Sequence, residues 1–324
     1  MAQEQKHVGV FSAAGYAGGE LIRLLLKHPN IGTITVSSDS KEGMDTAEAC
    51  HPFLKNTFNT KLVGSDVKNF LDCDLVVIAA EDKSDTSGTV ESLLSSGIKV
   101  IDMTPTYRLG SEGRTPAVYG IPELHRGSIR GADLVATPGC MATAAILSAY
   151  PLSHTEMVDR VIFDCKIGLS AVGSQPAPRA HYPSASQSVY GYENHPHRHY
   201  PEIRDALKTR AHFFPQIVPV SRGILCSAYL HLNSDTELKK LKRIYEDFYA
   251  KDFFIRMVAT PSTAFVRGSN FCDVGGFSLE DKLFVCSCAI DNLGKGGAGQ
   301  AIQNMNLMLG FDERSGLDTP PIFP

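Results

Sequence analysis

The stretch from Val8 to Lys27 limits the folds open to this chain more than any other part of the sequence. Its first four residues are apolar or glycine and predict a short buried strand. Small residues follow from Ser12 to Gly19, and helix-forming residues continue from Glu20 to Lys27. A strand, a small-residue turn and a helix together suit a dinucleotide phosphate, because the turn lets the pyrophosphate approach the backbone and the helix N-terminus supplies donors.

The spacing within this turn is G-x-x-G-x-x-G rather than the more familiar G-x-G-x-x-G, and Ser12 stands at the first glycine position. Glycine turns before helices are common, so the motif is also compatible with a turn that binds nothing. If the turn binds a dinucleotide, the candidate cofactor-binding residues are Ser12, Gly15, Tyr16, Ala17 and Gly18.

Strands and helices alternate through the rest of this half of the chain. Further apolar, β-branched runs predict strands at 33–37, 75–79, 99–103 and 132–136, with helices at 67–70 and 86–96. Such alternation predicts an α/β fold with a Rossmann-type, doubly wound parallel sheet.

The second half has a different pattern and predicts a separate α+β domain with a mainly antiparallel sheet. The expected strands are 160–167, 213–221, 224–232, 265–271 and 283–290, with a helix at 236–249. A last helix is predicted at 298–309, where apolar residues recur every three or four positions and form one buried face.

The second strand of the parallel sheet ends in Ser37-Ser38-Asp39-Ser40-Lys41. Hydroxyls and a lysine at this strand tip suit the 2′-phosphate of NADP, whereas an acid would bind an unphosphorylated ribose. Asp39 therefore weakens the preference for NADP that Ser37, Ser38 and Lys41 give. A solvated polar loop is the alternative interpretation.

A second strand–turn–helix unit contains Cys140. An apolar strand ends before Pro138-Gly139, and helix formers run from Met141 to Tyr150, so Cys140 falls in the first helical turn. Unpaired backbone N–H groups and the helix dipole favour the thiolate there, which is the nucleophilic form of cysteine. The alternative is a buried cysteine that packs as a small hydrophobe.

A polar stretch from Gly168 to Pro201 contains three alternating histidines, His195, His197 and His199. A long irregular segment within a compact domain is more often functional than not. A metal site is one interpretation, but no nearby carboxylate or cysteine completes a usual ligand set, so no metal is expected. The others are a solvated loop and an acid/base histidine that serves Cys140.

Arg222 is expected at a turn between two strands, where its planar guanidinium could bind a carboxylate; a surface arginine is equally compatible with the sequence.

Composition excludes several classes of protein. With 324 residues, 43% of them hydrophobic, and a formal charge of -4, the chain gives no support for binding to nucleic acid or a membrane surface. No apolar run is long enough to span a bilayer, and the N-terminus carries no signal-peptide pattern. The eight cysteines form no C-x-x-C pair, which predicts reduced thiols in a cytoplasmic protein.

Several stretches together resemble the N-acetyl-γ-glutamyl-phosphate reductases of arginine biosynthesis. They occur in order along nearly the whole chain, at 15–21, 118–124, 138–140, 197–203, 218–224 and 291–310. The His-Arg-His-x-Pro-Glu-Ile stretch and the glycine-rich C-terminal run are specific, whereas the glycine turn is not.

The resemblance implies NADP-dependent reduction of an acyl phosphate to an aldehyde with loss of phosphate. It implies Cys140 as the nucleophile and His197 as its partner, with a thioester intermediate that hydride then reduces. It also implies a dinucleotide-binding domain of residues 1–139 and 295–324, a catalytic and oligomerisation domain of residues 140–294, and a homodimer or homotetramer. Further residues implied near substrate or nicotinamide are Ser170, Arg198, His199, Arg222, Asn292 and Gly296.

Two departures from the family pattern matter. Ser12 replaces the usual first glycine, and Ser174 stands where an arginine is typical. The missing arginine leaves recognition of the phosphate open, because a guanidinium would be the natural anion clamp.

Other functions remain compatible with these residues. A lysine-pathway relative that reduces a carrier-protein-bound aminoadipyl phosphate, and a semialdehyde dehydrogenase of the same superfamily, would share the chemistry. A cofactor-free cysteine hydrolase would not explain the glycine turn. A catalytically retired NADP-binding sensor would need neither Cys140 nor His197.

Overall fold

Two β-sheets organise the chain in the computed structural model, which describes residues 5–80, 85–110, 115–192 and 197–323. Each sheet belongs to its own compact unit. The first unit contains the chain up to Pro138 and the segment Gly297–Thr319, and the second contains Gly139–Gly296 and the residues from Pro320 onward. The boundary at Pro138 falls immediately before the Gly139-Cys140 pair.

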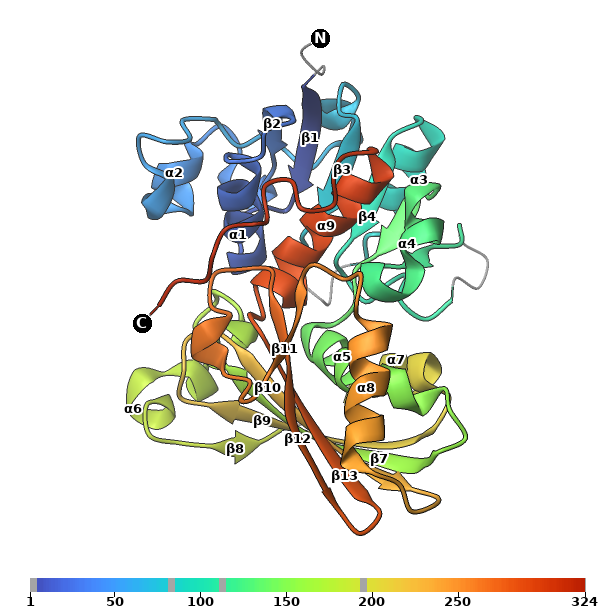
Figure 1. The fold of residues 1–324 in the computed structure, drawn as a ribbon. Coiled ribbons are helices and arrows are strands. Elements are labelled where there is room, and N and C mark those ends of the chain that lie inside the picture. Colours follow the sequence, from blue (N-terminus) through green and yellow to red (C-terminus); the bar gives the residue numbers. More distant parts are fainter. Residues whose placement is uncertain (1–4, 81–84, 111–114, 193–196, 324) are drawn as a thin grey trace. The chain divides into compact units, whose positions relative to one another are not determined.

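The sheet of the first unit is parallel and has the order β2-β1-β3-β4-β6-β5 (Figure 1). Its strands are β1 (Lys6–Phe11), β2 (Ile31–Val36), β3 (Leu75–Ile78), β4 (Lys99–Asp102), β5 (Val118–Tyr119) and β6 (Leu134–Ala136). The helices of this unit are α1 (Tyr16–Leu25), α2 (Thr46–Ala49), α3 (Ser87–Ser95), α4 (Pro122–Arg130) and α9 (Gly299–Met308). This arrangement confirms the predicted Rossmann-type sheet.

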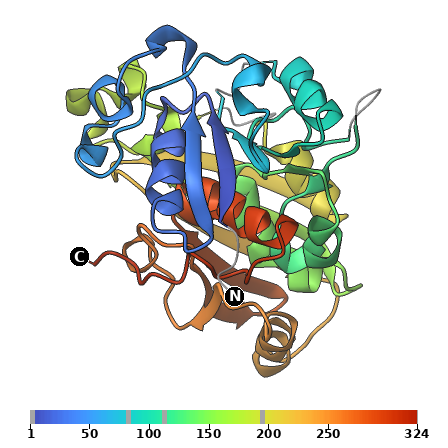
Figure 2. The same ribbon diagram turned by 90° about the horizontal axis from the view of Figure 1, so that it is seen from above.

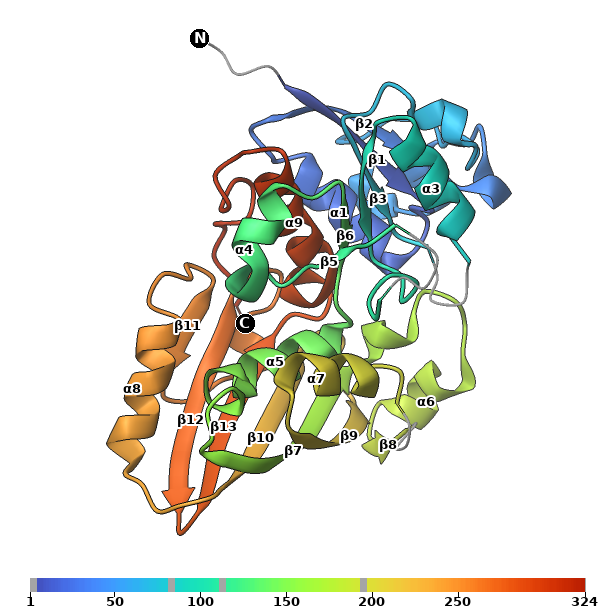
Figure 3. The ribbon, with the colours of Figure 1, turned by 90° about the vertical axis from the view of Figure 1, so that its right-hand side faces the viewer.

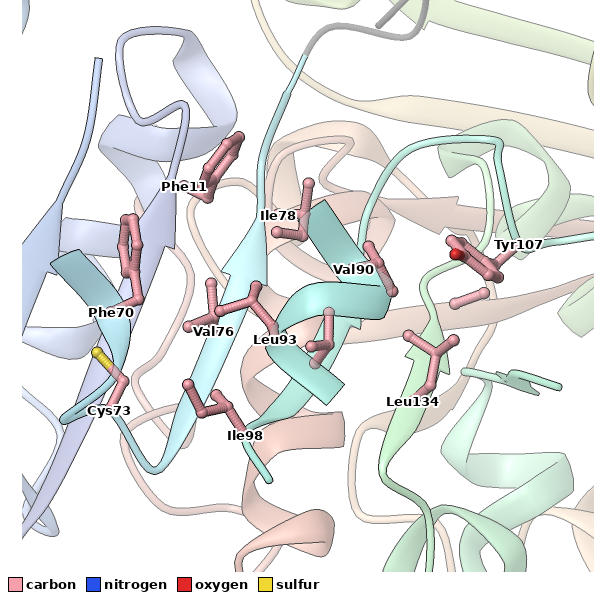
Figure 4. Close-up of a cluster of buried hydrophobic side chains, with 12 residues drawn as sticks. Phe11, Phe70, Cys73, Val76, Ile78, Val90, Leu93, Ile98, Tyr107 and Leu134 are labelled. Carbon is pink, nitrogen blue, oxygen red and sulfur yellow. The ribbon is translucent and has the colours of Figure 1, made fainter. Parts of the chain in front are cut away.

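Helices cover both faces of this sheet. On one face, α1 packs against β1 and α9 packs against β4, and the two helices contact each other (Figure 2). On the other face, Val90 and Leu93 of α3 join Phe11, Phe70 and Val76 in one hydrophobic cluster (Figure 4). Strand β3 and the last four residues of β1 are buried on both sides, which explains why these residues are all apolar or glycine.

The sheet of the second unit has the order β11-β12-β13-β10-β7-β9-β8. Its strands are β7 (Val158–Gly168), β8 (Tyr190–Gly191), β9 (Arg210–Val218), β10 (Ile224–Leu232), β11 (Ile255–Val258), β12 (Cys272–Glu280) and β13 (Leu283–Ile290). Its helices are α5 (Cys140–Ser153), α6 (Tyr182–Ala185), α7 (Tyr200–Leu207) and α8 (Leu238–Phe248). The pairings β12–β13, β13–β10, β10–β7 and β9–β8 are antiparallel, which confirms the mainly antiparallel character expected from the sequence.

One face of this second sheet is covered by helices. Side chains alternate between buried and partly exposed along β7 and β10. Helix α5 packs on β7, β10 and β13, and α8 contacts β12 (Figure 3). The partly exposed side chains of β7 and β10 lie on the opposite face of the sheet.

The strand expected at 265–271 is wrong. Thr263–Phe265 is a 3₁₀ turn, and Gly268 has a φ of +72°, which breaks any extended run through this segment. The strands that flank this region are β11 and β12, and β12 begins only at Cys272. The polar stretch from Gly168 to Pro201 is also not wholly irregular, since it contains α6, β8 and short 3₁₀ turns.

All eight cysteines are free thiols. Among the described residues, no helix has both the length and the apolar character that a membrane span requires.

Candidate functional site

Cys140 is the first residue of α5. Gly139 precedes it in extended conformation, and the carbonyl of Gly139 accepts the first intrahelical bond, from the N–H of Thr143 at 2.9 Å. The rest of α5 is almost entirely buried, whereas Cys140 is partly exposed. The thiol therefore lies at the N-terminal end of the helix, where the positive end of the helix dipole favours a negative charge on sulfur. Because the rest of α5 is buried in the core, this position is fixed.

The Gly139 position is shaped by two residues of the histidine-rich segment. A Cβ on Gly139 would collide with the imidazole ring of His199. The N–H of Gly139 donates to Oε2 of Glu202 at 3.0 Å, and that carboxylate is 2% exposed. Because α7 carries Glu202 and begins just after His199, this helix holds the residue that precedes the thiol.

His197 packs behind His199. Their ring centroids are 4.8 Å apart in an edge-to-face arrangement, and both side chains are buried. The N–H of His199 donates to Nδ1 of His197 at 3.0 Å. Since Nδ1 is an acceptor in this bond, the neutral His197 ring carries its proton on Nε2.

Arg198 lies between these two histidines in sequence and is exposed. His195 lies outside the described residues. Among the described residues, no group of three or more histidine, cysteine, aspartate or glutamate side chains is arranged as a metal site.

Arg222 is bound to an acidic side chain of the same unit. Its Nε and Nη2 donate to Oδ1 of Asp291 at 3.1 and 3.0 Å, and its side chain is 24% exposed. Gly223 follows with a φ of +118°, and a Cβ there would lie 2.6 Å from Cβ of Thr263. The turn between β9 and β10 therefore needs glycine, and it presents a partly exposed guanidinium.

Asn292 and Ser170, which the sequence assigned to cofactor and substrate respectively, are hydrogen-bonded to each other. Nδ2 of Asn292 donates to Oγ of Ser170 at 2.9 Å, and its Oδ1 accepts from the N–H of Gly223 at 2.8 Å. Ser174 lies nearby in sequence and is exposed. Gly296 packs closely against Cys140, since a Cβ on it would lie 2.9 Å from Cβ of Cys140.

The expected phosphate turn of the first unit has the features that a pyrophosphate requires. Gly15 is the N-cap of α1, with open space where a Cβ would stand. Gly18 allows close packing of helix and turn, because a Cβ on it would collide with the carbonyl of Ala13. Tyr16 is 49% exposed and Ala17 is partly exposed, so the first helical turn is accessible. These residues fit a bound dinucleotide.

Ser12 has a φ of +59°, a conformation that glycine adopts more readily. Its N–H donates to Oγ of Ser37 at 3.1 Å, and Ser37 is fully buried. The buried Ser37 hydroxyl thus fixes the start of the turn through its hydrogen bond with the Ser12 backbone.

The tip of β2 holds the other expected cofactor residues. Oδ1 of Asp39 accepts from the N–H of Ser65 at 2.7 Å, so this carboxylate is engaged with the backbone. Nζ of Lys41 donates to the carbonyl of Ala49 at 2.6 Å. Ser38 is mostly buried, and its N–H donates to the carbonyl of Val63.

Sequence reasoning did not select Arg108, Glu202 or Asp291. Arg108 donates from Nε to the carbonyl of Thr137 at 2.9 Å and from Nη2 to that of Met103 at 2.7 Å, which fixes a cation to the backbone three residues before Cys140. For Asp291 the available signal was a charged residue directly after the strand that ends at Ile290.

A buried acid also ends β4. Burial raises the pKa of Asp102 to about 6, although Thr104 donates to the carboxylate from both its N–H and its hydroxyl and Arg108 lies near enough to oppose the shift. The backbone carbonyl of Asp102 accepts from the N–H of Thr137, which ties β4 to the segment that leads to Cys140.

Comparison with known proteins gives matches over nearly the whole chain. The family model described as "Semialdehyde dehydrogenase, NAD binding domain" matches residues 7–132, and the model described as "Semialdehyde dehydrogenase, dimerisation domain" matches residues 140–292. The N-acetyl-gamma-glutamyl-phosphate reductase of Archaeoglobus fulgidus is 44% identical and covers 98% of this chain and 99% of its own. The corresponding protein of Methanosphaera stadtmanae is 39% identical, with 98% of each chain covered.

Solved structures with the same fold are aspartate semialdehyde dehydrogenases. That of Vibrio cholerae, complexed with ASA, gives a TM-score of 0.75 at 13% identity and covers 95% of this chain and 99% of its own. That of Candida albicans, with NADP, gives a TM-score of 0.71 at 17% identity, with 94% and 98% covered. At such identities the likeness concerns the fold alone.

Proposed function

Because the chain belongs to the N-acetyl-γ-glutamyl-phosphate reductase family, a group of oxidoreductases, we propose that it reduces N-acetyl-γ-glutamyl phosphate to N-acetylglutamate 5-semialdehyde with release of phosphate. The observation that carries this proposal is the Cys140 thiol at the start of a buried helix, directly after Gly139, which the His199 ring packs against, and close to Gly296. A cysteine kept partly exposed in so ordered a setting is suited to covalent catalysis.

In the proposed reaction, the Cys140 thiolate attacks the acyl carbon, and the carbon–oxygen bond to phosphate breaks with the electron pair leaving on phosphate. A thioester on Cys140 results. NADPH, held by the phosphate turn at Ser12, Gly15, Tyr16, Ala17 and Gly18, would supply the hydride that this thioester needs. Breakage of the carbon–sulfur bond then releases the aldehyde and restores the thiolate.

His197 is assigned the acid/base role. Its N–H on Nε2, which follows from the acceptor role of Nδ1, is a proton that can stabilise charge on the substrate or on the departing thiolate. His199 and Glu202 position Gly139, and we assign His199 a further contact with substrate.

Recognition of the substrate anions needs cations. We assign the carboxylate of the acyl group to the partly exposed Arg222 guanidinium. We assign Ser170 and Arg198 to the substrate as well. We assign the leaving phosphate to Arg108, because its planar guanidinium is a cation held at the backbone of Thr137, three residues before Cys140. Arg108 would take the place of the arginine that is typical of the family at the position of Ser174.

NADP is the proposed cofactor rather than NAD. The Asp39 carboxylate accepts from Ser65 and so is turned to the backbone, which reduces its repulsion of a 2′-phosphate. Ser38 and Lys41 are the donors proposed for that phosphate, and Asn292 and Gly296 are assigned to the nicotinamide end.

The test is NADPH formation from N-acetylglutamate semialdehyde and NADP, with and without phosphate, in the wild type and in Cys140→Ala. Activity that requires phosphate and falls by on the order of 10³-fold or more in the variant supports the proposal. A steady-state rate of NADPH formation that does not depend on phosphate contradicts it, whereas a single-turnover burst without phosphate does not. Silence with this aldehyde, together with NADP binding, favours the carrier-bound aminoadipyl substrate instead.

A further inference from the structure

A buried carboxylate at the end of β13 connects three segments of the second unit. Asp291 is fully buried, and its Oδ1 accepts from the Arg222 guanidinium and from the N–H groups of Leu293 and Gly294 at 2.9 and 3.1 Å. Its Oδ2 accepts from the N–H of Gly268 at 2.6 Å. Five donors from three parts of the chain thus converge on one side chain.

The turn that Asp291 organises has little freedom. A Cβ on Gly294 would collide with the carbonyl of Ser269, so this residue is pressed against the neighbouring loop. The N–H of Gly296 donates to the carbonyl of Asp291 at 2.9 Å. The side chain of Asp291 and its main chain therefore fix opposite ends of the same glycine turn.

This turn lies directly against the nucleophile. The position of a Cβ on Gly296 is 2.9 Å from Cβ of Cys140, closer than two such carbons normally approach. A displacement of the turn would therefore change the space in which the Cys140 side chain rotates. Misplacement of a reacting group by about 1 Å can cost on the order of 10²-fold in rate.

We propose that Asp291 is a positioning residue that holds the glycine turn 294–296 against Cys140 and so confines the thiol to its reactive orientation. This inference rests on the proposed function only in that Cys140 is taken as the nucleophile. It also gives Arg222 a second task beside substrate binding, because the guanidinium neutralises the buried Asp291 charge.

The test compares Asp291→Asn with Asp273→Asn. Asp273 is matched to Asp291, because it is also a buried aspartate of this unit paired with an arginine, Arg256, at 2.6 Å. In Asp291→Asn an amide NH₂ group replaces one of the two carboxylate oxygens. It cannot accept the hydrogen bonds that this oxygen accepted, so the turn loosens. We expect kcat to fall by about tenfold or more with KM within about twofold, and iodoacetamide to alkylate Cys140 faster than in the wild type.

Asp273→Asn is expected to lower the thermal midpoint while it leaves kcat and the alkylation rate at wild-type values. If both variants lower kcat equally, or if Cys140 alkylation is unchanged in Asp291→Asn, the positioning role is wrong. Alkylation needs no substrate, so it tests this inference even if the wild type proves inactive as a reductase, which would refute only the proposed function.

Arg222→Lys provides a milder variant should Asp291→Asn fail to fold. Lysine keeps the charge beside Asp291 but loses the two-nitrogen contact. Loss of positioning lowers kcat and raises the alkylation rate, whereas loss of a substrate anchor alone raises KM. A change in KM alone would overturn the inference.

Discussion

Gly139 lies between the His199 ring and the Glu202 carboxylate, and this placement determines where the next residue, Cys140, begins its helix. The φ of Gly139 is -62°, which any residue can adopt, so the requirement for glycine is one of space and not of backbone conformation. At the residue scale, the site therefore depends on the absence of a side chain at Gly139, next to the thiol.

Gly139→Ala tests this requirement. The added methyl group must displace the His199 ring, and we expect a loss of about 1–3 kcal/mol in unfolding free energy together with a marked fall in kcat. The matched control is Gly127→Ala within α4, where nothing lies near a Cβ and helix propensity favours alanine by about 0.5–1 kcal/mol. Denaturant unfolding and turnover measured on both variants check the prediction, and equal behaviour of the two would refute it.

His51 supports the phosphate turn and makes it sensitive to pH. The ring is buried, its Nε2 donates to the carbonyl of Ala13 at 2.7 Å, and burial lowers the pKa of the imidazole below its usual 6.5. When the pH is well above 6.5, His51 is neutral in both the folded and the unfolded chain. As pH falls below about 6.5, the unfolded chain takes up the proton first, so the folded state loses stability until the folded pKa is passed.

His51→Gln removes this titration and keeps a side-chain N–H donor. We expect the wild type to lose unfolding free energy relative to this variant between about pH 7 and pH 5, at about 1.4 kcal/mol for each unit of pKa difference. Urea unfolding curves at several pH values measure the difference. Curves that stay parallel across this range would contradict the assignment.

At the scale of elements, β1, its turn and α1 follow directly from the sequence, because the apolar run and the glycines encode local structure. The 254–271 region does not, since apolar alternation at 265–271 resembled a strand while Gly268 requires a positive φ. The proximity of His199 to Gly139 was also beyond prediction, because 60 residues separate them in the sequence and they meet where α7 packs on α5. Local periodicity carries no information on such pairings.

The first turn of the parallel sheet offers a test of one departure from the glycine motif. Ser12 holds a left-handed conformation that costs about 1–2 kcal/mol for a residue with a Cβ. Ser12→Gly keeps the N–H that donates to Ser37, so we expect unchanged or slightly higher stability and an unchanged Kd for NADP. Ser12→Val, which is β-branched, is expected to destabilise the unit. Calorimetric titration and thermal unfolding decide; weaker NADP binding by Ser12→Gly would show that the hydroxyl itself binds cofactor.

At the scale of the whole molecule, the chain consists of two units with different sheets, and the alternating and antiparallel halves were distinguishable from sequence patterning. The boundary at Pro138 and the return of 297–319 to the first unit depend on contacts between distant segments. The second sheet has α5 and α8 on one face, and its other face carries partly exposed side chains such as Tyr229. We infer that a second copy of the chain covers that face, in agreement with the description of the matching family model.

Tyr229→Glu places a charge at the middle of β10 on this face, and we expect it to dissociate the oligomer, because burial of an unpaired carboxylate is costly. Light scattering after size exclusion gives the mass of each species. Phe53→Glu, at an exposed position of the first unit, should leave the mass unchanged. A Tyr229→Glu protein with the wild-type mass would place the interface elsewhere.

The central claim is that Cys140 carries the acyl group as a thioester. The most direct measurement mixes the enzyme with N-acetylglutamate semialdehyde and NADP in the absence of phosphate and follows NADPH on the millisecond scale. We expect a burst of about one NADPH per chain, followed by slow turnover, because the thioester accumulates when no phosphate is present to accept the acyl group. Cys140→Ala should give no burst. A wild-type enzyme that forms NADPH only when phosphate is present, with no burst and no acyl adduct on the Cys140 peptide, would contradict the covalent mechanism.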